Sequence, residues 1–356
     1  WIQNSKWVLG EKIGSGSFGE VFQGMNNLGR LFAVKRLHIA GQRDVVDTLA
    51  NEIQLMRDYA HPNIVGYLGA EVDDEAGIVN IFQEWVPGGS LAHLLGRFGA
   101  FSDGVVANYT RQIVTGLQFL HSNGIIHRDI KGGNILVDEV GNVKLADFGA
   151  STHVNQFDKT VETYALKGTP YFMAPEVLGE SRYGRKGDIW AVGCTMIQML
   201  TGQPPWKDHN VNGIIQLHLL VSSWKGPPNY PKDNISTECQ NCIEWCFRHT
   251  EAERPTAQEL LQSDFLLQEE DLEDSSGNLL RNPGGAVDED ADDGAPDDSL
   301  EDSGVMTGLR MKMDRVAQST DSLFNPIIPK NATAQHNVDT MKGVQNEIAR
   351  RKLARK

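Results

Sequence analysis

Apolar positions divide the chain into stretches of different periodicity. Up to about residue 85, β-prone runs at 7–13, 20–26, 30–39 and 78–85 are separated by Gly or Asn turns. The interval 44–60 instead repeats apolar residues at spacings of three and four, which indicates a helix, at Val46, Leu49, Ile53 and Met56. From Leu91 to about Leu267 helical patterns dominate. The pattern predicts a small β-rich lobe followed by a larger helical lobe.

The last stretch, 268–356, differs in composition. Residues 268–303 hold 14 Asp and Glu against the single Arg281, and 308–356 are basic. A stretch so poor in apolar residues buries too little surface to offset its ordering entropy, so we expect disorder. The acidic block explains most of the net charge of −14, and nothing indicates nucleic-acid binding. The basic end, 343–356, fits either a solvated terminus, which we favour, or an amphipathic helix for a partner or an anionic surface.

The length of the chain and its N-terminal residues limit the number of domains and the cellular locations to be expected. A chain of 356 residues predicts two domains, or one domain with a tail. No apolar run approaches the roughly 18 residues that span a bilayer, and residues 1–10 do not resemble a signal peptide. We therefore expect a cytoplasmic protein without a transmembrane segment. The chain starts with Trp1 rather than Met, which favours a fragment or a processed form.

The four cysteines are too few and too clustered for a secreted disulfide framework. Three of them form, with a histidine, a spacing that a zinc site can use: Cys239, Cys242, Cys246 and His249. Spacings of three and four also match one buried face of a helix, and apolar neighbours favour that interpretation. We expect buried free thiols, with zinc as the less favoured alternative.

Three glycines near the N-terminus, Gly14, Gly16 and Gly19, fit the pattern G-x-G-x-x-G-x-V that Val21 completes. The spacing alone is weak, because dinucleotide-binding folds share it. In those folds the glycines open a helix, whereas here strand-like sequence continues on both sides. The pattern therefore predicts a hairpin tip whose backbone amides cover phosphate groups.

Further motifs follow in a fixed order. Lys35 ends a β-prone run, and Glu52 lies in the predicted helix 44–60. The segments HRDIKGGN, DFG and APE then occupy residues 127–134, 147–149 and 174–176. Taken alone, HRDIKGGN fits a charged surface turn, Lys35 a solvated strand end and Glu52 a surface charge. Together and in this order, the motifs resemble the protein kinase family across about residues 7–267.

This resemblance implies an α+β, bilobal protein-kinase fold. The N-lobe, 7–84, holds a small antiparallel sheet with one regulatory helix, and a hinge at 84–87 joins it to a mainly helical C-lobe, 88–267. An N-terminal extension, 1–6, precedes this domain, and the acidic-then-basic tail, 268–356, follows it.

The resemblance also implies catalytic and cofactor-binding roles, with ATP and Mg²⁺ as cofactors. Asp129 is the expected catalytic base for a substrate hydroxyl, assisted by Lys131 and Lys35, and Asn134 and Asp147 are the expected Mg²⁺ ligands. The residues expected to bind ATP are Ile13, Gly14, Gly16, Gly19, Val21, Ala33, Lys35, Glu52, Gln83, Glu84, Val86, Ser90 and Leu136. Within this set, Val21, Ala33 and Leu136 sandwich the adenine, backbone groups of Glu84 and Val86 bind its edge, and Glu52 holds Lys35 in place.

Structural roles follow from the same resemblance. Glu176 and Arg254 are expected to form a buried ion pair, and Asp188 is expected to brace the catalytic loop. Thr169 is expected to bridge Asp129 and Lys131, which makes it a poor phosphorylation site.

The type of kinase is read from Lys131, which is the serine/threonine signature. Strings such as HRDIKGGNIL and GTPYFMAPEV are most similar to the MAP kinase kinase kinases of the sterile-type group. The p21-activated-like kinases are the nearest alternative, and a pseudokinase scaffold is a second one. Ser90 and Gly133 stand where basophilic kinases place Glu, so the expected substrate is a folded kinase, a MAP kinase kinase, rather than a basic motif.

Regulation is expected through an upstream kinase, a scaffold or autophosphorylation. Arg128, directly before the expected base, places a fixed cation beside the site. A phosphate on the activation segment, within residues 150–168, would pair with this cation. Thr163 is the favoured phosphosite and Thr160 the second. The alternative is that these are only exposed loop hydroxyls.

Overall fold

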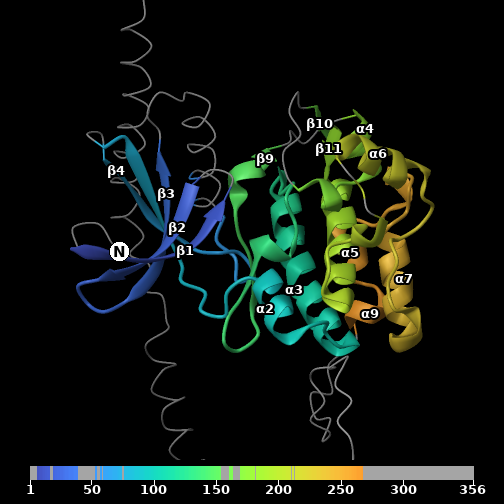
Figure 1. Ribbon diagram of the computed structural model, residues 1–356, viewed down its shortest axis with the longest axis horizontal. Coiled ribbons are helices and arrows are strands. Elements are labelled where there is room, and N and C mark those ends of the chain that lie inside the picture. Colours follow the sequence, from blue (N-terminus) through green and yellow to red (C-terminus); the bar gives the residue numbers. More distant parts are fainter. Residues whose placement is uncertain are drawn as a thin grey trace, which may run out of the picture. The chain divides into compact units, whose positions relative to one another are not determined.

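The computed structural model describes residues 6–16, 19–38, 53, 57, 59–73, 76–153, 160–162, 169–180, 182–209, 211 and 213–267, without the side chains of 16, 153 and 160–162. Figure 1 shows a β-sheet at one end of this part of the chain and a larger group of helices at the other. The predicted α+β, two-lobe fold is confirmed. The predictions for 268–356 and for Thr163 lie outside the described residues.

Five antiparallel strands form the first lobe, in the order β1-β2-β3-β5-β4. They are β1 (Trp7–Gly16), β2 (Gly19–Asn26), β3 (Leu31–His38), β4 (Tyr67–Asp73) and β5 (Ile78–Gln83). The predicted hairpin is present, because Gly14 pairs with Val21 and Gly16 with Gly19. Of the segment 44–60 that the sequence predicts as a helix, the structure describes four residues, Ile53, Arg57, Tyr59 and Ala60. Ile53 and Arg57 are helical and Ile53 is buried, whereas Tyr59 and Ala60 are not helical.

The two faces of this sheet carry different side chains. One face packs Phe32, Val34 and Phe82 into a core, with Trp7, Leu9, Phe22 and Leu68 against it. Successive side chains of a strand point to opposite faces, and directly paired residues share a face. Because Lys35 pairs with Val21 and Ala33 pairs with Gln83, the other face carries these four side chains. All four are residues that the sequence assigns to nucleotide binding.

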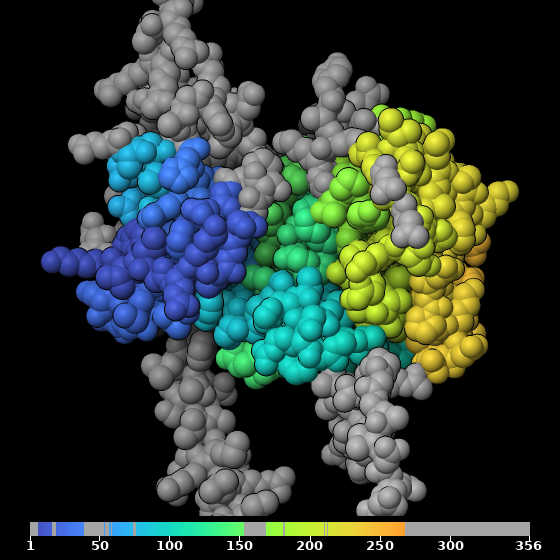
Figure 2. Space-filling view, in the orientation of Figure 1, coloured from blue at the N-terminus to red at the C-terminus, as the bar shows by residue number. Residues whose placement is uncertain are grey.

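The second lobe consists of helices around one buried helix, α5 (Arg185–Thr201), in which every residue from Asp188 to Leu200 is buried. Around it lie α2 (Leu91–Phe98), α3 (Asp103–Ser122), α4 (Pro175–Glu180), α6 (Ile214–Ser223), α7 (Thr237–Cys246), α8 (Ala257–Leu260) and α9 (Asp264–Leu267). Figure 2 shows the side chains of this lobe, coloured cyan to orange, closely packed on the visible face.

Short elements connect these helices. Among the residues that the structure describes, two-stranded ladders pair β6 (Ile125–Ile126) with β9 (Thr152–His153), β7 (Ile135–Val137) with β8 (Val143–Leu145), and β10 (Thr160–Glu162) with β11 (Arg182–Gly184). The 3-10 turns that bear on the site are η1 (Gly132–Asn134), η2 (Phe148–Ala150) and η3 (Pro170–Phe172). The others are η4 (Lys207–His209), η5 (Lys232–Asn234) and η6 (Glu251–Glu253).

The cysteines are free and buried, as predicted. Burial raises the pKa of the Cys194 and Cys239 thiols well above the ordinary value. Within the described ranges, no group of three or more His, Cys, Asp or Glu side chains is placed to hold a metal ion, so the zinc alternative is not supported there. In the same ranges, no helix is long and apolar enough to cross a membrane.

Candidate active site

The segment 127–134 runs from the end of β6 through η1 into β7, between two ladder strands that fix its ends. Asp129 lies in its middle, and its side chain is 10% exposed. One carboxylate oxygen, Oδ2, accepts hydrogen bonds from Lys131 Nζ at 2.8 Å and from Asn134 Nδ2 at 2.7 Å. The other, Oδ1, accepts from the backbone N–H of Thr169 at 2.9 Å and from its hydroxyl at 3.1 Å. Four donors thus hold the carboxylate in one orientation.

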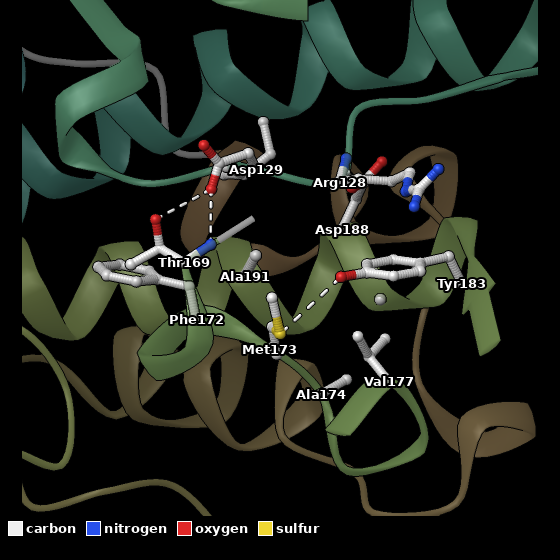
Figure 3. Close-up of a pocket in the computed structure, with 12 residues that line it drawn as sticks. Arg128, Asp129, Thr169, Phe172, Met173, Ala174, Val177, Tyr183, Asp188 and Ala191 are labelled. Atoms are coloured by element: carbon white, nitrogen blue, oxygen red, sulfur yellow. Dashed lines mark hydrogen bonds between the residues drawn. The ribbon is translucent and has the colours of Figure 1, made fainter. Parts of the chain in front are cut away.

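Thr169 also contacts the lysine of this network. Lys131 Nζ lies 2.5 Å from the Thr169 hydroxyl oxygen, so the predicted bridge between Asp129 and Lys131 is confirmed. Figure 3 shows the Thr169 and Asp129 side chains facing one another across this contact. The bridge ties the end of the activation segment, where η3 begins, to the loop 127–134.

Asp188 holds the loop from the other side. Its carboxylate accepts from the backbone N–H groups of His127 at 2.9 Å and Arg128 at 2.8 Å, and it lies 2.8 Å from His121 Nε2. Burial raises the pKa of Asp188, but hydrogen bonding and the nearby histidines more than offset this, so the pKa lies below its ordinary value. The predicted bracing of the loop by Asp188 is confirmed.

The two expected Mg²⁺ ligands lie on segments joined by a backbone hydrogen bond, from the N–H of Ala146 to the carbonyl of Asn134 at 2.9 Å. Asn134 donates both its side-chain hydrogen bonds to Asp129, so its amide oxygen remains as the group able to bind a cation. Asp147 has a left-handed backbone, with φ of 64°, and its Oδ1 accepts from Lys35 Nζ at 2.9 Å. Burial opposes ionisation of Asp147, yet Lys35 lowers its pKa below the ordinary value.

Lys35 connects the sheet to this site. Its side chain is 7% exposed, on the sheet face that also carries Val21, Ala33 and Gln83. Leu136 of β7 forms an isolated bridge with Ser90, which follows the predicted hinge. Glu52, the expected partner of Lys35, lies outside the described residues.

The predicted hinge offers one acceptor and one donor. The Glu84 N–H donates to the carbonyl of Gly66 at 2.8 Å, and the Glu84 carboxylate lies 3.0 Å from Lys144 Nζ. In the described part of the chain, the carbonyl oxygen of Glu84 and the N–H of Val86 have no hydrogen-bond partner. Such a pair matches the donor and acceptor on the edge of an adenine ring.

The hairpin of β1 and β2 leaves space at one glycine and packs closely at another. A Cβ added to Gly14 would meet no atom within 4 Å, which leaves open space there, whereas one added to Gly19 would collide with the carbonyl oxygen of Arg36. Ile13 stands beside this hairpin and is 48% exposed. The hinge pair, the Asn134 oxygen and the Lys35–Asp147 pair together fit ATP with Mg²⁺.

Arg128 belongs to the loop 127–134 and directly precedes Asp129. Its backbone has φ of 73°, and its guanidinium lies 4.3 Å from the centre of the Tyr183 ring. Figure 3 shows the Arg128 and Tyr183 side chains next to one another. The buried Nε and Nη2 atoms of Arg128 have no hydrogen-bond partner among the described residues. Burial lowers the pKa of this guanidinium, against the attraction of Asp188. Val161 of β10 pairs with Tyr183 of β11, so the activation segment passes close to this residue.

The large-lobe ion pair is present and buried. Arg254 Nη1 lies 2.8 Å from Glu176 Oε1, and the Arg254 side chain is fully buried in the lobe. Arg254 also donates to the carbonyls of Lys186 and Arg248 and packs over the Trp190 ring. The predicted pairing of Glu176 with Arg254 is confirmed, and these contacts make it structural.

Sequence reasoning missed two contacts in this region. Gln198, in the middle of α5, accepts a hydrogen bond from the Gly132 N–H at 3.1 Å. Lys144 ties β8 to the predicted hinge through Glu84. The sequence signal for Gln198 was a polar residue in the largely apolar stretch 189–200, and Lys144 offered none.

The comparisons with known proteins agree with this geometry. Residues 7–266 match the protein kinase domain family. The chain is 42% identical to "Mitogen-activated protein kinase kinase kinase A" of Dictyostelium discoideum over 276 residues, 75% of this chain and 28% of that protein. It is 41% identical to "Mitogen-activated protein kinase kinase kinase ANP1" of Arabidopsis thaliana over 286 residues, 78% and 42% of the two chains.

A human relative gives the same result. "Mitogen-activated protein kinase kinase kinase 1" of Homo sapiens is 38% identical over 269 residues, 73% of this chain and 18% of that protein. This chain spans less than half the length of these relatives. The predicted similarity to the MAP kinase kinase kinases is confirmed, and the chain belongs to the protein kinase family.

Proposed function

We propose that this chain is an ATP-dependent protein serine/threonine kinase that acts as a MAP kinase kinase kinase. The observation that carries the proposal is the Asp129 carboxylate, held by Lys131, Asn134 and Thr169 at one end of the site. A carboxylate fixed by four donors keeps one geometry, which a base that aligns a substrate hydroxyl requires.

ATP with Mg²⁺ supplies the phosphoryl group when bound. On this proposal the carbonyl of Glu84 and the N–H of Val86 bind the adenine edge, and Val21, Ala33 and Leu136 enclose the ring. Lys35 would hold the α- and β-phosphates, and the Asn134 oxygen and Asp147 would hold the metal ion. Ile13, Gly14, Gly16, Gly19, Glu52, Gln83 and Ser90 complete the proposed nucleotide site.

The remaining residues act on the substrate side. Asp129 would orient the hydroxyl and accept its proton, while Lys131, 2.8 Å away, would stabilise charge on the transferred group. Thr169 keeps both side chains in place through its hydroxyl.

The substrate class is inferred from the absence of carboxylates at positions 90 and 133 and from the names of the relatives. Ser90 and Gly133 put no carboxylate where a substrate Arg would bind, so basic peptides gain no charge pairing there. The names of the relatives point to MAP kinase kinases, which are folded proteins. We therefore infer that recognition uses the folded surface of a MAP kinase kinase.

Regulation by phosphorylation of the activation segment is part of the proposal. Arg128 has buried N–H groups that lack a partner in the described part of the chain, and a phosphate would supply one. Thr163 remains the favoured site and Thr160, at the start of β10, the second. An upstream kinase or scaffold and a cytoplasmic location remain predictions.

A panel experiment tests the substrate class. The protein, ATP and Mg²⁺ are incubated with catalytically inactive MAP kinase kinases, and phosphosites are mapped by mass spectrometry. We expect Ser or Thr phosphorylation in the activation segment of at least one of them. Modification of a basic peptide but of no MAP kinase kinase would contradict the assignment.

A further inference from the structure

Two polar side chains of α5 reach the loop 127–134. Asp188, near the start of the helix, accepts from the N–H groups of His127 and Arg128. Gln198 lies ten residues later, about 15 Å along the helix axis, and its Oε1 accepts from the Gly132 N–H at 3.1 Å. The buried helix thus holds the loop at two points, one on each side of Asp129.

Close approach at the second point depends on a glycine. A Cβ added to Gly132 would lie 2.7 Å from Gln198 Oε1, which is closer than Cβ atoms come to other atoms in proteins. It would also lie 3.3 Å from the backbone nitrogen of Ala92. Gly132 is buried and Gln198 is 8% exposed, so water does not readily replace this bond. A buried N–H that loses its acceptor is destabilising, so the backbone moves to reach another partner.

Gly132 sits between residues that the proposed mechanism uses. Lys131 precedes it, and Asn134 follows two positions later in η1. The Asn134 N–H donates to the carbonyl of Lys131 at 2.9 Å, so the turn moves as a unit when its first residue moves. A shift at Gly132 therefore displaces both the Lys131 ammonium and the Asn134 oxygen.

We propose that Gln198 is a positioning residue that sets the Lys131–Asn134 turn through the Gly132 N–H. The effect of Gln198 on catalysis rests on the proposed kinase function. Gln198 is not itself a catalytic residue, because it contacts the backbone of Gly132.

Three variants test this. Gln198→Met keeps the side-chain volume but removes the strong acceptor, and Gln198→Glu keeps an oxygen in the same place. Thr195→Val is the matched control, since Thr195 is buried in α5 and its hydroxyl bonds to the carbonyl of Ala191 in the same helix. The readouts are kcat, KM for ATP, the Mg²⁺ concentration for half-maximal rate, and the thermal midpoint of unfolding.

We expect Gln198→Met to lower kcat about 10-fold or more, because small misplacements of reacting groups are costly. The Mg²⁺ requirement should rise several-fold with little change in KM for ATP, and Gln198→Glu should restore most of the loss. Thr195→Val should change neither kcat nor the Mg²⁺ requirement. An unchanged kcat and Mg²⁺ requirement in folded Gln198→Met, or equal losses in Gln198→Met and Gln198→Glu, would overturn the proposal.

Amide hydrogen exchange provides a test independent of activity. In Gln198→Met the Gly132 amide should exchange about 10-fold faster than in the wild type, and in Thr195→Val at the wild-type rate. If Gln198→Met does not fold, Gly132→Ala should produce the same rise in Mg²⁺ requirement, and a wild-type requirement there would overturn the proposal. Failure of the wild type to transfer phosphate would refute the kinase function, while the exchange rates would still decide the role of Gln198.

Discussion

Removal of the Thr169 hydroxyl isolates one contact of the catalytic network. Thr169→Val keeps the shape of the side chain and the backbone N–H that donates to Asp129 at 2.9 Å. It removes the hydroxyl that donates to Asp129 at 3.1 Å and contacts Lys131 Nζ at 2.5 Å. The perturbation is therefore confined to the bridge between the base and the lysine.

The size of the effect follows from the lost bonds. A hydrogen bond to a charged group contributes about 1.5–3 kcal/mol, and the bridge joins two charged groups. If the bridge is worth this much in the transition state, kcat falls about 10- to 150-fold, since 1.36 kcal/mol corresponds to a factor of ten. KM for ATP should change little, because Lys35, Asp147 and the hinge do not contact Thr169.

Steady-state kinetics on one protein substrate measures this effect, with Thr169→Ser as the control. The serine variant keeps the hydroxyl and should retain most of the wild-type kcat. A Thr169→Val enzyme with wild-type kcat would refute the assignment of the bridge to catalysis. Equal losses in both variants would show that the methyl group, not the hydroxyl, matters.

Three further changes have defined outcomes. Lys35→Met should reduce phosphate transfer about 100-fold or more and weaken ATP binding, because it leaves the Asp147 carboxylate without its buried cation. Steady-state kinetics measures the transfer and nucleotide titration measures the binding. Phosphate transfer at the wild-type rate would contradict the role proposed for Lys35. Asp188→Asn should lower stability by about 3 kcal/mol at pH 7. The pKa of Asp188 is lower in the folded protein than in the unfolded chain, where it is about 4. The stability difference between wild type and Asp188→Asn should therefore be complete above about pH 4 and should disappear as the pH falls through the pKa of the folded protein. Thermal unfolding measures this difference, and a difference that grows toward acidic pH would contradict the prediction. The four buried thiols should react with a thiol reagent only after denaturation, and fast labelling of the native protein would contradict their burial.

Much of the fold was predictable because it depends on local periodicity. The alternation of β3 separates the core side chains from Ala33 and Lys35, and the sequence of that strand shows this pattern directly. The helical repeat in α7 likewise explains why Cys239 and Cys242 are buried. The resemblance to the protein kinase family implied the pairing of Glu176 with Arg254, 78 residues apart, which periodicity alone does not predict.

Contacts made through the backbone were not predictable in the same way. The bond from the Gly132 N–H to Gln198 depends on how α5 packs under the loop, and no side-chain pattern encodes the position of an N–H group. The pairing of β10 with β11 is also invisible to periodicity, because each strand has only three residues. Tertiary packing decides both features.

The most direct test of the account is phosphoryl transfer by the wild type and by Asp129→Asn, measured side by side with labelled ATP. Asparagine keeps the size of the side chain and one acceptor oxygen but cannot take the proton. We expect the wild type to label Ser or Thr of a MAP kinase kinase, and Asp129→Asn to bind ATP normally while transferring phosphate at least about 100-fold more slowly. Equal transfer by the two proteins, or no transfer by a folded wild type that binds ATP, would contradict the central claim.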